Sequence, residues 1–384
     1  NKTNFSSSTV NITGDLTDSG TSFAGTINFV GNSDQKFTPN TSTTYGDINI
    51  GDGTSASKTI FAGDVNAGKI LINEKAKLQT NNGIEIHATS FDVKEGAELI
   101  LNNATVTTSE DSTYRGLSGT GFTISAAESK KITITIDQDT VETEGNQNYF
   151  ASVKLTNETT FKSGGTIIFG NATTNAFVQN DDVAPKLILQ APTVIYGNST
   201  IDSITTSDSL SLESDNTINN LSVTNAGGKT LTVNGEITVD SMTLSGTSSE
   251  SLLQIDGSVS GSFNLTTPPA QYVGNYLKFA QPNTPTVSVN GDNNQKAKIR
   301  NSKNSADGIT SFPYGWEYDN TFTWTGATSN DWNVATNWDQ GEVPNVDSVV
   351  VIPADKKVII SGNFTHSGTI TNNGELTFGE NAGP

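Results

Sequence analysis

The stretch "ILINEKAKLQTNNGIEIHATSFDVKEGAELIL" (residues 70–101) places brief apolar segments at a nearly constant interval. Apolar triplets begin at positions 70, 84, 91 and 99, and "KLQ" (77–79) fits between the first two. The step is about seven residues, and three steps make a turn of about 21 residues, which is typical of a solenoid. Such short strands bury no core alone. We therefore predict that each stacks on its counterpart one turn away, with a rise of about 4.8 Å per coil.

Similar triplets separated by Gly, Asn, Asp and Ser recur over residues 1–265, for example at 27–29, 48–50, 187–189, 221–223 and 231–233. A β-sandwich would need longer strands, of about five or six residues. The pattern predicts an all-β chain folded as a right-handed parallel β-helix (a β-solenoid). Ile, Leu and Val would stack inside it, while Thr, Ser, Asn and Asp would face water.

Composition narrows the function classes. Hydrophobic residues make up only 33% of the 384 residues, and 21 basic residues stand against 40 acidic ones, a formal net charge of −19. A chain this acidic is repelled by nucleic acid and by anionic membrane surfaces, so neither is expected as a partner. Cysteine is absent, which excludes disulfides and thiolate metal sites. No stretch approaches the roughly 18 apolar residues of a membrane span.

Two changes of character divide the remainder of the chain. Residues 266–315 carry several prolines and a basic cluster, and proline cannot donate to a central β-ladder. We predict an irregular break or linker there. Residues 316–384 form a Trp-rich segment in which strand signals return as "VVVI" (349–352) and "VII" (358–360), so further β-coils are expected at this end.

Catalytic residues are hard to find in the sequence. The two histidines, His87 and His366, are almost 280 residues apart, and the only arginines are Arg115 and Arg300. β-Helical enzymes that cleave polysaccharides need clustered acids on adjacent coils, and only Asp181 and Asp182 form an adjacent pair in a loop-like segment. We therefore expect no enzyme activity, with a polysaccharide-active enzyme as the alternative.

Calcium is the one metal that the sequence makes worth considering. Asp52, Asp181, Asp182 and Asp292 lie in turn-like segments rich in hard oxygen ligands. None of these segments matches an EF-hand loop or a calcium-binding nonapeptide repeat. Asp and Asn are also common in turns for conformational reasons alone. The prediction is no cofactor, with Ca²⁺ as the alternative.

Four tryptophans gather in a chain with only 8% aromatic residues: Trp316, Trp324, Trp332 and Trp338. As a ligand platform, the indoles would stack on sugar rings while Asn330, Asp331 and Asn337 held the hydroxyls. As a packing device, they would fill a place where a narrow β-core widens or is closed, since terminal repeats of solenoids must be capped. The sequence favours the packing role and leaves a carbohydrate-binding module as an alternative.

The segment "TWTGATSNDWNVATNWDQGEVPNVDSVVVIP" (323–353) resembles segments of large bacterial surface and secreted repeat proteins. "GTINFVGNSDQKFTPNTSTTYGDINI" (25–50) resembles a second form, found in β-helical cell-surface proteins of spirochaetes and related bacteria, and 164–180 is similar to a degenerate copy. The wider character is similar to autotransporter passengers and filamentous adhesins. The resemblance implies an extracellular β-helical protein that often mediates adhesion, and it supplies no catalytic residues.

The sequence thus predicts a non-enzymatic bacterial protein, secreted or on the cell surface, whose β-solenoid acts in adhesion or as a structural, assembling component. The expected partners are host or cell-surface glycans or proteins, and further copies of the chain. Many weak contacts along a polar face would add through avidity, and exposed ends of the solenoid would template association.

Overall fold

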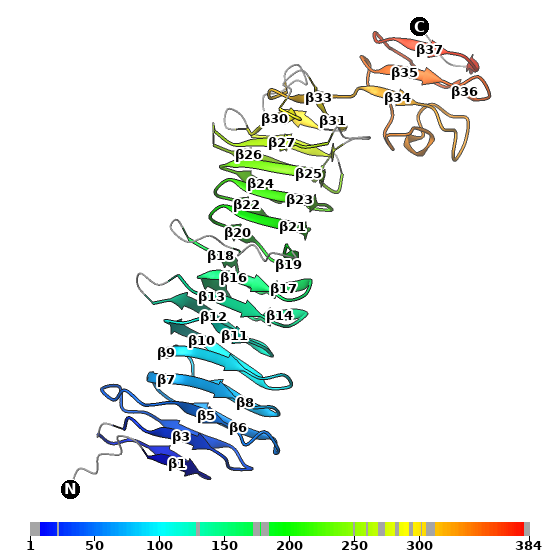
Figure 1. Ribbon diagram of the computed structural model, residues 1–384. Coiled ribbons are helices and arrows are strands. Elements are labelled where there is room, and N and C mark those ends of the chain that lie inside the picture. The colour runs from blue at the N-terminus through cyan, green and yellow to red at the C-terminus, as the bar shows by residue number, and fades with distance from the viewer. Residues whose placement is uncertain are drawn as a thin grey trace.

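A computed structural model describes residues 8–20, 23–127, 131–171, 177, 184–248, 250–258, 260–267, 273–280, 284–291, 295–300, 302–304 and 312–379. In these residues the regular structure is β-strand apart from one short 3₁₀ helix, η1 (Ala335–Asn337). The strands pair in parallel and stack as a β-solenoid of about 16 turns (Figure 1). The predicted all-β parallel solenoid is confirmed, and its right-handed winding stays a prediction.

Strands β1 to β33 form one continuous ladder arranged as three faces, and each turn of the chain around them is one coil. Seven strands bend at a corner and serve two faces each: β7 (Val65–Ile72), β9 (Glu85–Val93), β10 (Glu98–Thr108), β12 (Leu117–Ala126), β21 (Ser199–Thr206), β23 (Asn216–Val223) and β25 (Glu236–Ser245).

The first face also contains β1 (Thr9–Ile12), β3 (Thr26–Phe29), β5 (Ile48–Ile50), β11 (Ser112–Tyr114), β13 (Thr133–Ile136), β16 (Ser152–Leu155), β27 (Ser262–Leu265) and β30 (Thr286–Val289). The second face contains β2 (Leu16–Thr17), β4 (Gln35–Thr38), β6 (Ser57–Phe61), β8 (Ala76–Thr80), β14 (Thr140–Thr143), β17 (Thr159–Ser163), β19 (Lys186–Gln190), β28 (Gly274–Asn275), β31 (Ala297–Arg300) and β33 (Trp316–Tyr318). The third face contains β15 (Gln147–Phe150), β18 (Ile167–Phe169), β20 (Thr193–Ile195), β22 (Leu210–Leu212), β24 (Thr230–Val233), β26 (Leu253–Gly257), β29 (Leu277–Phe279) and β32 (Lys303–Asn304).

Inward side chains stack in columns that hold the coils together. Ile48 pairs with Ile70 and Ile70 pairs with Phe91, and all three side chains are fully buried. Burying each such side chain stabilises the fold by about 1.5–3 kcal/mol, before the entropy cost of ordering the chain. Aromatic rings join these columns, as where Tyr149 stacks on Phe169 with ring centroids 5.0 Å apart. A strand of three or four residues therefore gains its core from the coils above and below it.

The parallel ladder continues through the described part of 266–315, for which the sequence predicts a break or linker. Gly274 pairs with Leu244 on one side and with Ile299 on the other, and β33 pairs with β31. Pro285 and Pro313 lie just outside β30 and β33, where a missing N–H interrupts no pairing. In the described residues, regular pairing extends past residue 265 as far as Tyr318.

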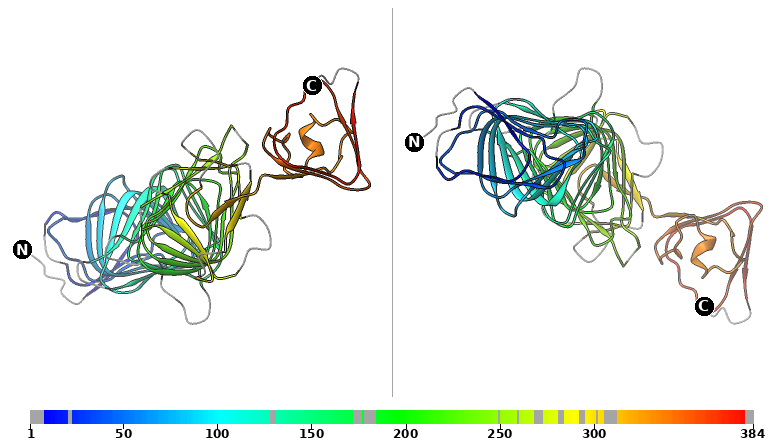
Figure 2. Two further views of the ribbon diagram at one scale, coloured as in Figure 1. Left: turned by 90° about the horizontal axis from the view of Figure 1, so that it is seen from above. Right: turned by 90° about the horizontal axis from the view of Figure 1, so that it is seen from below.

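A second, shorter stack follows. β34 (Thr321–Thr323), β35 (Val349–Ile352) and β37 (Ile370–Asn372) form one sheet, and β36 (Lys357–Ile360) pairs with β38 (Glu375–Phe378). Figure 2 shows this unit end-on as a triangular coil with η1 inside it. The further β-coils predicted for this end of the chain are therefore present. Among the described residues, the structure contains no helix with the length and apolar character needed to cross a bilayer.

Candidate functional site

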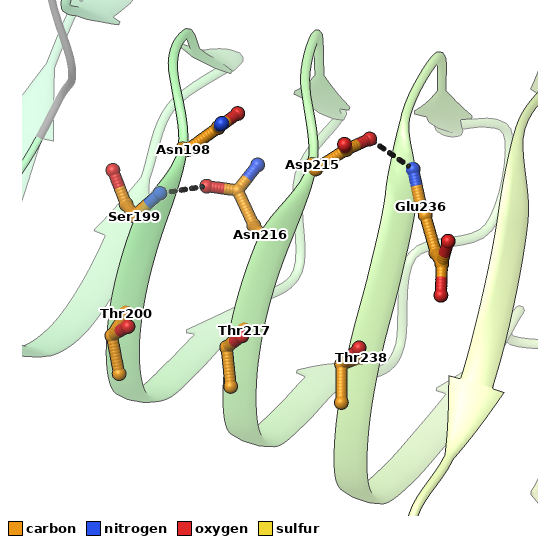
Figure 3. A pocket seen from close by; sticks show the side chains of 8 residues that line it. All are labelled: Asn198, Ser199, Thr200, Asp215, Asn216, Thr217, Glu236 and Thr238. Carbon is orange, nitrogen blue, oxygen red and sulfur yellow. Dashed lines mark hydrogen bonds between the residues drawn. The ribbon is translucent and has the colours of Figure 1, made fainter.

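A polar groove of about 230 Å³ crosses three consecutive coils at a corner of the first face. It is formed where β21, β23 and β25 begin (Figure 3). The side chains that line it are polar without exception: Asn198, Ser199, Thr200, Asp215, Asn216, Thr217, Glu236 and Thr238.

The groove has a regular geometry because the three strands are in register. Thr200 pairs with Thr217 and Thr217 pairs with Thr238, so three threonines form an outward column. Two residues before each of these threonines, Asn198, Asp215 and Glu236 form a second outward column (Figure 3). Neighbouring members of a column are about 4.8 Å apart, the spacing of paired strands. A hydroxyl group thus repeats once per coil, and beside it stands an amide group in the first coil and a carboxylate group in the next two.

Buried amide and hydroxyl groups hold the floor of the groove. Ser199 and Asn216 are 5% and 4% exposed. The Ser199 N–H donates to Asn216 Oδ1 over 3.1 Å, and Asn216 Nδ2 donates to the Ser214 carbonyl over 2.7 Å. The Glu236 N–H donates to Asp215 Oδ1 over 2.7 Å. These bonds hold the backbone from which the outward columns project.

The chemistry of this groove is that of hydrogen bonding to hydroxyl groups. Threonine hydroxyls both donate and accept, and the carboxylates accept. One carboxylate oxygen of Asp215 accepts a hydrogen bond from the backbone N–H of Glu236 in the next coil. The Glu236 carboxylate is the acceptor at the end of the same column (Figure 3). No histidine, cysteine, lysine or arginine lines the groove, so it holds neither a nucleophile–base pair nor a cation for an acidic ligand.

A larger groove, of about 760 Å³, crosses the second face further toward the N-terminus. Glu142, Glu144 and Lys162 line it, and Lys162 Nζ lies 2.6 Å from a Glu142 carboxylate oxygen on the neighbouring coil. Gly119 forms part of its wall with φ of +140°. A Cβ there would lie 1.8 Å from the Leu101 carbonyl oxygen, so only glycine fits. This groove therefore brings two glutamates and one lysine together on adjacent coils. The sequence offers Asp181 and Asp182 as the candidates for such an acidic cluster.

The four tryptophans are all buried, and the structure divides them between two cores. Trp316 is 5% exposed and packs against Phe263 and Phe279 in the core of the long solenoid. Trp324, Trp332 and Trp338 are 1–3% exposed and form the core of the shorter stack with strands β34 to β36. Their ring faces are covered by protein and offer no surface on which a sugar can stack, which favours the packing role over the ligand platform.

Asn337 organises the loop that carries these indoles. Its side chain is fully buried. Oδ1 accepts hydrogen bonds from the N–H groups of Thr328 and Ser329, over 2.8 and 2.9 Å. Nδ2 donates to Ser329 Oγ and to the Asp331 carbonyl, both over 2.9 Å. The Asn337 amide, which the platform hypothesis places on a ligand's hydroxyls, therefore makes its hydrogen bonds within the protein.

Of the residues predicted as calcium ligands, only Asp52 lies in the described part of the chain. Asp181, Asp182 and Asp292 lie outside the described residues. Asp52 is exposed, and N–H groups of Ser55 and Thr54 donate to its Oδ1, which holds the pKa of its carboxyl below the usual value. This is the geometry of an Asx turn. Within the described part of the chain, no three histidine, aspartate or glutamate side chains are grouped to hold a metal ion.

The threonine groove was not singled out in the sequence, although a signal exists. "NST" (198–200), "DNT" (215–217) and "EIT" (236–238) share a polar residue two positions before a threonine. Their spacing changes from 17 to 21 residues, so no fixed period aligns them, and the pairing of β21, β23 and β25 is needed to bring them together. Comparison of the chain with protein-family models, with curated proteins and with solved structures gives no match.

Proposed function

We propose that this chain is an elongated β-solenoid of a bacterial extracellular surface protein that acts in adhesion or as a structural surface component, without catalysing a reaction. The observation that carries the proposal is the register of outward polar side chains over successive coils, as in the column of Thr200, Thr217 and Thr238. A repeating ligand that runs along the solenoid meets the same group once per coil.

An extended neutral glycan is the ligand class that suits such a surface. A sugar ring in an extended chain is about as long as the inter-strand distance of about 4.8 Å, so successive rings meet successive coils. Each hydrogen bond contributes little after exchange with water, about 0.5–1.5 kcal/mol. Many such contacts made together give useful affinity through avidity. Adhesion of this kind needs no deep pocket and no cofactor.

The test is a glycan array probed with the protein displayed on beads, so that many copies act together. The test variant replaces Thr200, Thr217 and Thr238 with alanine. The control variant replaces Thr205, Ser222 and Thr243, an outward column in register on the second face of the same coils. We expect the test variant to lose most bead binding and the control to retain it. Equal binding by both variants, or no glycan retained by the unaltered protein, contradicts the proposal.

A second candidate function rests on the larger groove. Glu142, Glu144 and Lys162 lie together there on adjacent coils, and a polysaccharide-active enzyme requires acids and a base in that arrangement. Release of reducing ends from acidic and neutral polysaccharides, compared between the unaltered protein and Glu142→Gln and Glu144→Gln, decides between the two. Activity that both substitutions abolish would favour the enzyme over the adhesin.

A further inference from the structure

A pocket near the N-terminal end collects positive charge in a strongly acidic protein. It has a volume of about 320 Å³ and lies at the edge of the second face, where β6 and β8 begin. Its charged lining residues are Asp34, Lys58, Lys75, Lys77 and Glu98. Three lysines and two carboxylates give this pocket a formal charge of +1 (3 − 2), whereas the whole chain carries −19.

Two of the lysines are direct neighbours on adjacent coils. Lys58 of β6 pairs with Lys77 of β8, and Lys77 pairs with Glu98 of β10. Lys58 Nζ lies 2.6 Å from an Asp34 carboxylate oxygen, and Lys77 Nζ lies 2.5 Å from one of Glu98. The outward column therefore contains, in order, an acidic residue, two lysines and a second acidic residue. Like charges directly opposite each other destabilise a strand pair, so the two central lysines carry a cost that alternating charges would avoid.

The side chains of these two lysines are less exposed than those of other ion-paired lysines. The Lys58 and Lys77 side chains are 28% and 33% exposed, whereas those of the described lysines in other ion pairs are 37–51% exposed. Reduced contact with water strengthens the interaction of a cation with an anion. An anion that enters this pocket therefore meets cations that are partly desolvated before it arrives.

Lys75 adds a backbone cost at the same place. Its φ is +61°, a left-handed conformation that glycine and asparagine adopt more readily than lysine. Its Nζ donates one long hydrogen bond, of 3.4 Å, to the Thr54 carbonyl. A strained residue is a reason to look for function at that position. Here the strained residue is the third cation of the pocket.

We propose that this pocket binds a single oxyanion, the carboxylate or sulfate group of an acidic sugar. Lys58, Lys75 and Lys77 would supply charge-assisted hydrogen bonds. The local charge of +1 suits one anionic group, and the charge of the whole chain disfavours an extended polyanion such as a nucleic acid. The site does not depend on the threonine column and stands whether or not the protein is an adhesin.

The test is calorimetric titration of the whole chain at low ionic strength with sodium sulfate, inorganic phosphate, sodium glucuronate and glucose. Sulfate or glucuronate should bind saturably, and glucose should not bind at this pocket. Stronger binding of phosphate than of both others would overturn the assignment to an acidic sugar. Lys75→Ala and Lys77→Ala should each weaken anion binding about ten-fold, the equivalent of one charge-assisted hydrogen bond. The matched control is Lys357→Ala, which removes a lysine that is ion-paired with Glu375 in the shorter stack, outside the pocket and both grooves, and should leave the affinity unchanged.

Lys75→Gly separates binding from folding. Glycine adopts φ near +61° without strain, so this variant should unfold at the same temperature as the unaltered protein or a higher one. Its affinity for sulfate or glucuronate should nevertheless fall about ten-fold. Absence of saturable anion binding, or equal affinity in the Lys75→Gly, Lys77→Ala and Lys357→Ala variants, would overturn the proposal.

Discussion

Asp64 Oδ1 accepts a hydrogen bond of 2.8 Å from the backbone N–H of Glu85, 21 residues further along the chain and one coil away. The same contact recurs in other coils, where a corner aspartate accepts from the next coil: Asp15 from Lys36, Asp47 from Lys69, Asp111 from Thr133 and Asp215 from Glu236. At a corner the backbone turns and a ladder partner is lost, so a side-chain acceptor replaces it. Part of the acidity of the chain is therefore structural.

Asp64→Ala should loosen one corner without unfolding the rod. Removal of the acceptor leaves the Glu85 N–H without its partner, and a hydrogen bond of this kind contributes about 1 kcal/mol. We expect hydrogen exchange of the Glu85 amide to become about ten-fold faster, with amides several coils away unaffected, because each repeat contacts only its neighbours. Asp64→Asn keeps an acceptor oxygen and should exchange nearly as slowly as the original. Equal exchange in all three proteins would show that the bond contributes nothing.

Gly119 and Gly96 offer a comparison of crowding with backbone strain. Both have positive φ, +140° and +71°. A Cβ on Gly96 meets nothing within 4 Å, whereas one on Gly119 would lie 1.8 Å from the Leu101 carbonyl oxygen. Gly96→Ala should lower the free energy of unfolding by about 1 kcal/mol, through strain alone. Gly119→Ala adds displacement of the adjacent coil and should cost at least about 3 kcal/mol. Urea denaturation of the two variants measures the difference, and equal midpoints would contradict the close approach.

Asn337→Ala should destabilise the shorter stack selectively. The substitution leaves the N–H groups of Thr328 and Ser329 and the Asp331 carbonyl without their buried partner, at a cost of about 3 kcal/mol or more. Three of the four tryptophans lie in this stack, so its unfolding is followed by a red shift of Trp emission. Asn333→Ala is the control, because Asn333 is exposed and its Nδ2 donates one bond of 3.3 Å. It should cost less than about 1 kcal/mol, and an equal loss in both variants would refute the central role of Asn337.

Asp137 should contribute stability that depends on pH. The Thr156 hydroxyl and the Arg115 guanidinium donate to its carboxylate, which holds the pKa of Asp137 below its ordinary value. A group with a lowered pKa in the folded state stabilises fully above the unfolded pKa of about 4, and that stability is lost as pH falls through the folded value. Asp137→Asn should therefore be less stable than the original at pH 7, and the gap should close below about pH 4. Thermal melting of both proteins across this range, with exposed Asp139→Asn as control, measures it; a gap that does not change with pH would contradict the interaction.

The divided tryptophans show where prediction from the sequence reached its limit. The sequence predicts that the tryptophans lie close together and are buried, because large apolar rings near the end of a narrow solenoid favour packing. The sequence does not predict that the tryptophans are divided between two cores, since Trp316 and Trp324 are only eight residues apart yet belong to different cores. Chain separation does not reveal where one stack of coils ends and the next begins. Strand pairing sets that boundary, between β33 and β34.

The sequence alone determined the repeating architecture. Triplets such as Ile48–Ile50 and Ile70–Ile72 are too short to bury a core within one coil, so only stacking along an axis removes them from water. The tertiary structure alone decided which polar residues meet. Coils of 17 to 30 residues align side chains that no constant period relates, which brings Thr200 beside Thr217 and Thr238, and Lys58 beside Lys77. The apolar pattern depends on local spacing, whereas the grooves and the charged pocket depend on how far each loop displaces the next coil.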